Sequence, residues 1–149
     1  MGLLDPDPVT NAPAVEVGRI AWAGPLTVMT SIAAVHLVRQ VVIRLPHIQV
    51  ASPALRIVPV TADTIILCSI AVVVFTLVSA FHDNPVPRFR WMAFGALLMS
   101  FLPLVNAGPI ADAPTAFGIG AMHVAAYVPC VTLLPWAAVP KTSKRQSPA

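Results

Sequence analysis

An uncharged stretch of 25 residues constrains this chain more than any other feature. Residues 115–139, TAFGIGAMHVAAYVPCVTLLPWAAV, contain no Asp, Glu, Lys or Arg. At about 1.5 Å per residue, a helix of this length crosses a hydrocarbon core roughly 30 Å thick. His123 lies well inside the stretch. Ionisable groups at such positions usually face a protein interior or a wet cavity, so the sequence predicts a membrane helix with one polar group inside it.

Three further apolar stretches have the length of membrane spans. The chain of 149 residues is 57% hydrophobic and 10% charged, whereas soluble domains are about 25% charged. The four predicted spans are residues 18–43, 63–81, 89–108 and 115–139. The prediction is therefore an all-α membrane protein, with one four-helix transmembrane bundle over residues 18–140. It lies between a flexible N-terminal tail, residues 1–17, and a basic C-terminal tail, residues 141–149.

The connections between the predicted spans contain several prolines. Residues 45–62 hold three prolines and no 3.6-residue period, which predicts a longer, partly ordered loop between the first two helices. Asp63 follows that loop and is expected to cap the second helix, since its carboxylate can accept from free amides. Pro85 and Pro87 are expected to hold the next connection as a short turn that cannot continue a helix.

The basic residues predict an orientation. One side of the membrane would carry both termini and the middle turn, with six basic residues: Arg19, Arg88, Arg90, Lys141, Lys144 and Arg145. The other side would carry three: Arg39, Arg44 and Arg56. The positive-inside rule then places both termini in the cytoplasm. The basic residues are scattered at helix ends, so the electrostatic footprint of a nucleic-acid-binding protein is missing.

Five polar side chains are predicted in the outer half of the bundle and form the candidate ligand-binding set. They are His36, Arg39, Asp63, Asn106 and His123. Two interpretations stay open. In the first the polar groups hold helices together: Arg39 pairs with Asp63, while His123 donates to Ser100 or to a carbonyl freed by Pro129. In the second they line a pocket for a small hydrophobic ligand or a lipid, because such sites form between facing helices.

Cofactor and metal sites find less support in the sequence. A b-type haem held by His36 and His123 is an alternative, although their expected depths differ by one to two turns. The four histidines show no metal-ligand spacing, and no metal site is predicted. Cys68 and Cys130 are expected several turns apart in depth, beyond the ~7 Å Cα separation that a disulfide allows. Both are therefore predicted to be apolar packing residues.

No catalytic motif is present. The chain has no GxSxG, HExxH, CxxC or glycine-rich phosphate loop. It is therefore expected to be non-enzymatic and to bind no cofactor. Small residues at Ala96, Ser100, Gly120 and Ala125 favour close helix packing. The expected partners are membrane lipid, other membrane subunits or further copies of the chain, and an accessory subunit of a larger membrane complex is the first alternative function.

Three segments resemble a family of small, uncharacterised four-helix membrane proteins met mostly in actinobacteria. They are RIAWAGPLTV at residues 19–28, NPVPRFRWMAFGALLMSFLPL at residues 84–104 and AMHVAAYVPCVTLL at residues 121–134. The resemblance implies a four-helix topology in the bacterial cytoplasmic membrane and places His123 in a recurring Met-His pair. It implies no activity.

Overall fold

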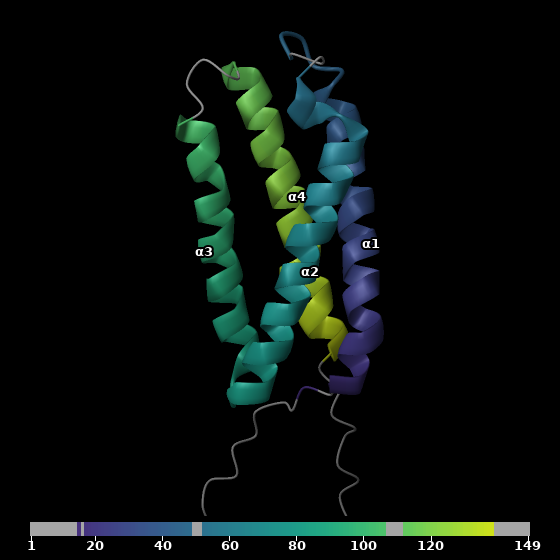
Figure 1. Ribbon diagram of the computed structural model, residues 1–149, viewed down its shortest axis with the longest axis vertical. Coiled ribbons are helices and arrows are strands. Elements are labelled where there is room, and N and C mark those ends of the chain that lie inside the picture. Colours follow the sequence, from purple (N-terminus) through teal and green to yellow (C-terminus); the bar gives the residue numbers. More distant parts are fainter. Residues whose placement is uncertain (1–14, 16, 49–51, 107–111, 139–149) are drawn as a thin grey trace, which may run out of the picture.

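The computed structural model describes residues 15, 17–48, 52–106 and 112–138. The elements in this part of the chain are all helical, and the four long helices run alternately up and down (Figure 1). They are α1 (Val17–Val42), the short 3-10 helix η1 (Pro53–Leu55), α2 (Ile57–Phe81), α3 (Pro85–Asn106) and α4 (Ala113–Ala138). The predicted tails lie outside the described residues apart from Val15 and Val17. The all-helical fold is thus confirmed.

Three of the helices, α1, α2 and α4, are long and apolar enough to cross a membrane. The helix α3 has 22 residues but is less apolar, and Arg88 and Arg90 lie in its first turns. Large apolar side chains cover the outside of the bundle. Five of them are 70% to 77% exposed: Leu37, Val58, Phe81, Trp91 and Phe117. Such an outer surface suits lipid rather than water.

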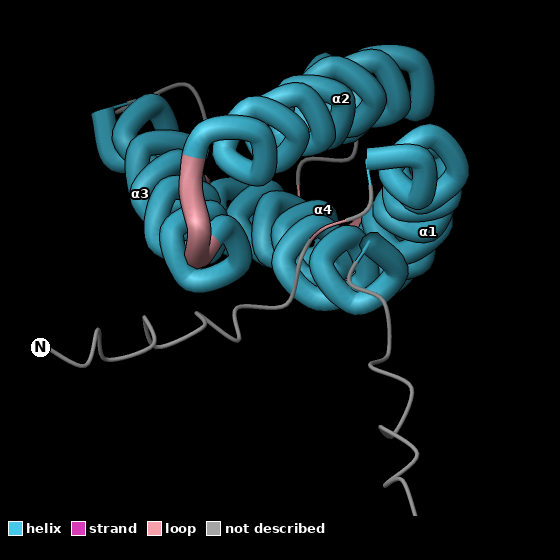
Figure 2. The backbone as a smooth tube through the Cα atoms, turned by 90° about the horizontal axis from the view of Figure 1, so that it is seen from below, coloured by secondary structure: helices cyan, strands magenta, loops and turns pink. Residues whose placement is uncertain are grey.

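The four helices form a ring in which α1 and α3 lie on opposite sides (Figure 2). The most extensive interface joins α1 to α4, which are the first and last helices of the chain, while α3 packs on α2 and α4. Buried side chains form two core clusters. One lies near the start of α1 and the end of α4, around Phe75, Phe89 and Leu134. The other lies near the end of α1, around Val35, Leu55 and Met122.

The interface between α1 and α4 depends on Gly118. A Cβ atom at this position would lie only 2.5 Å from Val42 Cγ1. The absence of a side chain therefore lets the two backbones approach closely, as small residues do in membrane helices. Further down, Ser31 Oγ on α1 donates a hydrogen bond to the Ala126 carbonyl, at 3.3 Å. Contacts between small and polar groups thus join the two ends of the chain.

The predicted start of the second helix is wrong. The helix α2 begins at Ile57, and Arg56 precedes it as the N-cap residue, so Asp63 lies inside the helix and does not cap it. Pro59 occupies the third helical position, where a missing amide costs no intrahelical hydrogen bond. The loop between α1 and α2 is correspondingly shorter than residues 45–62. Its described part includes His47 with φ 67° and η1, while residues 49–51 lie outside the described residues.

The turn between α2 and α3 is also shorter than predicted. The helix α3 starts at Pro85, and Pro87 lies within its first turn. Both prolines are tolerated there for the same reason, because the first amides of a helix have no intrahelical acceptor. Predicted and observed bounds of the first and last helices differ by one or two residues at each end.

Candidate functional site

Two cavities share His123 as a lining residue. The first, called the α1/α2/α4 cavity, has a volume of about 360 Å³. It is lined by apolar side chains such as Val35 and Met122, together with Asp63 and His123. The second, called the α2/α3/α4 cavity, has a volume of about 290 Å³. His123, Leu67 and Ala126 line both cavities, so the imidazole stands at the boundary between them.

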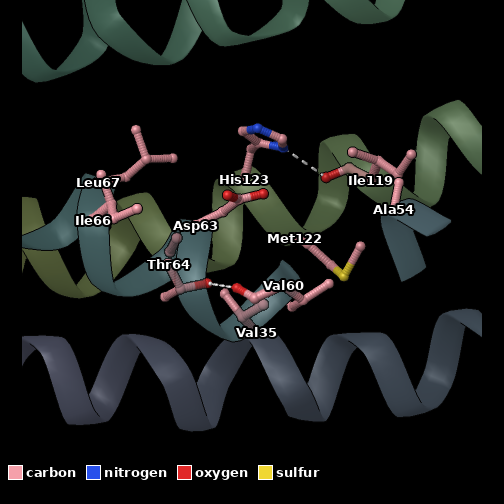
Figure 3. Close-up of a pocket in the computed structure, with 11 residues that line it drawn as sticks. Val35, Ala54, Val60, Asp63, Thr64, Ile66, Leu67, Ile119, Met122 and His123 are labelled. Carbon is pink, nitrogen blue, oxygen red and sulfur yellow. Dashed lines mark hydrogen bonds between the residues drawn. The ribbon is translucent and has the colours of Figure 1, made fainter. Parts of the chain in front are cut away.

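The α1/α2/α4 cavity contains two polar groups that face the same space. Figure 3 shows the Asp63 carboxylate on α2 and the His123 imidazole on α4 among the side chains that line this cavity. Thr64 lines it as well, but its hydroxyl donates to the Val60 carbonyl of its own helix, at 2.7 Å. The groups that remain available to a ligand here are therefore a carboxylate and an imidazole.

The hydrogen bond of His123 determines its tautomer. Nδ1 lies 2.9 Å from the Ile119 carbonyl oxygen, one turn earlier in α4. A carbonyl can only accept, so Nδ1 carries the proton and donates it. In the neutral ring Nε2 is then a hydrogen-bond acceptor. The ring also contacts Phe101 of α3, with centroids 6.2 Å apart, and this contact orients it between the two cavities.

The α2/α3/α4 cavity is mainly apolar. Alanines from three helices, including Ala71, Ala96 and Ala126, contribute to its wall. The other polar groups in the wall besides His123 are Ser100, Tyr127 and the thiols of Cys68 and Cys130. Ser100 Oγ donates to the Leu97 carbonyl at 2.6 Å. This cavity suits an apolar chain or ring with few polar atoms.

The predicted separation of the two cysteines is wrong. Cys68 Sγ and Cys130 Sγ are 3.6 Å apart, and the Cys130 thiol donates to Cys68. The error follows from the start of α2: with Ile57 as its first residue, Cys68 lies near the middle of the helix rather than at its outer end. Both are free thiols, 2% and 5% exposed.

Two members of the predicted site tie α1 to the start of α2. His36 Nε2 lies 2.9 Å from Thr61 Oγ1, and Thr61 donates its own proton to the Ile57 carbonyl. His36 Nε2 is therefore the donor to Thr61. Arg39 Nε donates to the Leu55 carbonyl, at 2.6 Å. Both side chains thus join α1 to the segment that follows the loop, at the Leu55 carbonyl of η1 and the Thr61 hydroxyl of α2.

Several predicted contacts are replaced by others. Within the described part of the chain, Arg39 does not pair with Asp63 but bonds the η1 carbonyl of Leu55. His123 bonds Ile119 rather than Ser100 or the carbonyl freed by Pro129. Asn106 is the last residue of α3, and its side chain lies outside the described residues. Of the five predicted site residues, the structure thus brings Asp63 and His123 to one cavity.

The two histidines considered for haem do not share a site. His36 faces Thr61 and lines neither cavity, whereas His123 lines both. Within residues 15–138, leaving out the segments that are not described, no group of three or more His, Cys, Asp or Glu side chains is placed to hold a metal ion.

One polar contact was missed in the sequence although a signal for it was present. Arg90 Nε of α3 donates to the Val131 carbonyl of α4, at 3.3 Å. Pro135 lies four residues after Val131 inside α4 and has no amide to donate to that carbonyl. A proline within a span identifies the carbonyl four residues earlier as an acceptor, and an arginine on the neighbouring helix supplies the donor.

Comparisons with known proteins do not relate this chain to any of them. No protein-family model, no curated protein and no solved structure matches the chain. The resemblance to the actinobacterial membrane-protein family stays a prediction. What the structure gives is a bundle with three helices able to cross a membrane and two cavities that meet at a histidine.

Proposed function

We propose that this protein is a membrane component that binds an apolar, chain-like molecule of the bilayer between α2, α3 and α4. The observation that carries the proposal is the α2/α3/α4 cavity, an apolar space with His123 in its wall. Two of the helices that border it, α2 and α4, are long and apolar enough to cross a membrane. The protein acts on this view as a holder of its ligand and not as a conventional enzyme.

The rim of the cavity supports access from the bilayer. Leu67, Ile70 and Met92 line the α2/α3/α4 cavity and are also 49%, 54% and 52% exposed on the outer surface of the bundle. A ligand dissolved in lipid can therefore enter sideways without passing through water. Access of this kind favours a lipid or an isoprenoid over a water-soluble metabolite, since the route offers no hydrogen-bonding groups for a polar molecule.

The polar end of the site indicates the chemistry of the ligand's head. His123 Nε2 is an acceptor, and Asp63 lines the α1/α2/α4 cavity, which His123 lines as well. A head that carries a hydroxyl or an amine can donate to these groups, while its apolar part occupies the α2/α3/α4 cavity. An uncharged or cationic head is favoured over an anionic one, which Asp63 would repel.

The test is native mass spectrometry of protein purified in a mild detergent. Wild type is expected to carry a bound small molecule, and Ala96→Phe, which fills the α2/α3/α4 cavity, is expected to lose it. Ala80→Phe is the matched control, because Ala80 is exposed on α2 and lies outside the cavity. Equal occupancy in both variants would contradict the proposal. A co-purifying polypeptide without a small molecule would instead support an accessory subunit of a larger complex.

We further propose that α3 is a fourth span and that both termini lie in the cytoplasm of a bacterial cell. The excess of basic residues, six against three, supports this orientation. In a Cys68→Ser/Cys130→Ser background, an added Arg145→Cys thiol is expected to react with a membrane-impermeant maleimide only after the cells are opened. Reaction in intact cells would reverse the orientation.

A further inference from the structure

The paired thiols lie where an apolar ligand would meet them. Cys68 and Cys130 come from different helices, both line the α2/α3/α4 cavity, and their sulfur atoms are 3.6 Å apart. Ser31 Oγ of α1 lies 4.0 Å from Cys130 Sγ. Neither cysteine belongs to the two core clusters, which lie on either side of this level. The pair therefore forms a distinct feature in the wall of the cavity.

The geometry is close to that of a disulfide. A disulfide bond is about 2.05 Å long, so the sulfur atoms need to approach by roughly 1.5 Å. The Cys130 thiol is the donor and the Cys68 sulfur the acceptor of the hydrogen bond between them. Oxidation requires a two-electron acceptor that can reach this position. Both cysteines are almost fully buried in helices able to cross a membrane, so that acceptor has to arrive through the apolar cavity.

We propose that Cys68 and Cys130 form a redox-active dithiol and that a lipid-soluble quinone bound in the α2/α3/α4 cavity oxidises it. This inference rests on the proposed function and names the ligand class. In the step, two S–H bonds break and one S–S bond forms. The two electrons and two protons pass to the quinone, whose two C=O groups become C–OH groups. Atoms and electrons balance with no further reactant.

The other polar groups of the cavity suit the two forms of such a ligand. The Tyr127 hydroxyl, in the same wall, can donate to a quinone carbonyl. His123 Nε2 is an acceptor and can receive a hydroxyl of the quinol product, for which the quinone has no equivalent donor. The site thus offers one group to each form of the ligand. The disulfide would also link α2 to α4, two of the three helices that line the cavity.

The experiment is anaerobic titration of the purified protein with a fully substituted benzoquinone that carries a decyl chain. Full substitution prevents addition of a thiol to the ring. Quinol formation is followed by absorbance, and free thiols are counted with a maleimide of high mass after denaturation. In wild type, one quinone is expected to be reduced for every two thiols lost, and dithiothreitol is expected to restore both thiols.

Two kinds of variant make the result specific. Cys68→Ser and Cys130→Ser each leave one thiol, which is expected to survive the titration with no quinol formed. The matched control is Cys68→Ser/Ser69→Cys, which keeps two thiols but moves one to an exposed position on α2. It is expected to retain both thiols. Oxidation of this control at the wild-type rate would show that the observed pair has no special role and would overturn the proposal.

Retention of both thiols by wild type in excess quinone would also overturn the proposal. A photoreactive azido derivative of the same quinone, applied to Cys68→Ser/Cys130→Ser, then separates the two claims. Labelling of residues in the α2/α3/α4 cavity without thiol loss in wild type would remove the redox step and leave the proposed ligand site standing. Absence of both labelling and thiol loss would count against the quinone and against the proposed function together.

Discussion

The two sides of α4 are built differently. Toward α1, Gly118 allows such close approach that a single Cβ atom would overlap Val42, and Ser31 adds a hydrogen bond to the Ala126 carbonyl. Toward α2 and α3, the same helix borders a cavity of about 290 Å³. On that side Gly120 is covered by a side chain, since an added Cβ would lie 3.1 Å from Phe101 Cε1. One helix therefore has a closed face and an open face.

The difference shows where binding capacity can arise in a bundle of this size. Lipid tails are as apolar as the side chains of membrane helices, so the hydrophobic effect does not favour contact between helices over contact with lipid. Association of the helices therefore depends on close packing and hydrogen bonds. At Gly118 the backbones of α1 and α4 leave no room even for a Cβ atom, although the same two helices, together with α2, border the α1/α2/α4 cavity of about 360 Å³. Where α3 is held by a few contacts, such as Arg90 to Val131, an apolar space persists. We infer that the closed face carries most of the stability and the open face carries the function.

The largest effect is expected at the closed face. Gly118→Leu should destabilise the protein by about 3 kcal/mol or more, because the added side chain has to displace the stiff, β-branched Val42. Unfolding in an SDS titration, followed by circular dichroism, measures this change. Gly95→Leu is the control. An added Cβ at Gly95 meets nothing within 4 Å, and the change there should stay within about 1 kcal/mol of wild type. A similar loss of stability in Gly118→Leu and Gly95→Leu would show that the contact between α1 and α4 at Gly118 is not especially tight.

A smaller effect is expected where α3 is attached. Arg90→Gln removes the donor to the Val131 carbonyl, which Pro135 leaves without its helical partner, and should cost about 1.5 kcal/mol. The same SDS titration gives the value, with Arg88→Gln on the same helix as the control, because the donor to the Val131 carbonyl is Arg90 and not Arg88. If the Arg90 variant matched its control, the attachment of α3 would have to depend on apolar contacts alone.

The smallest effect is expected at the contact between α1 and α2. His36→Leu removes the hydrogen bond to Thr61 and should cost about 0.6 kcal/mol, the typical value for a polar contact between membrane helices. Gln40→Leu, at an exposed position on α1, serves as the comparison. Ligand occupancy in the mass spectrum should be unchanged, because His36 lines neither cavity. A loss of bound ligand in the His36→Leu variant would indicate that His36 does contribute to ligand binding.

Much of the fold could be predicted from the sequence, because apolar length alone defines a membrane helix. The helices α1, α2 and α4, and the ends of α1 and α4, follow from it. The start of α2 could not be found this way, because residues 45–62 hold three prolines and show no helical period, while one of them, Pro59, is tolerated in the first turn of a helix. That one error placed Cys68 too near the membrane surface and hid its contact with Cys130.

The site was predicted less well, for a reason that lies in the helices themselves. A helix that is apolar all round has no pattern that tells which face points inward. The four residues His36, Arg39, Asp63 and His123 were predicted to share a site because they lie at a similar depth in the membrane. Their side chains nevertheless point in different directions around the helix axes. His36 and Arg39 turn toward Thr61 and Leu55, while Asp63 and His123 turn toward a shared cavity.

The central claim is that the open face of α4 holds a molecule of the bilayer. The most direct test is photo-crosslinking in proteoliposomes with a diazirine-labelled lipid chain, with mapping of the adducts by mass spectrometry. At the open face, around Met92 and Leu97, labelling should saturate and be displaced by unlabelled competitor. At exposed Leu37 on α1, labelling should rise in proportion to the probe. Labelling that is proportional and undisplaced at both places would show only lipid contact and would contradict the account.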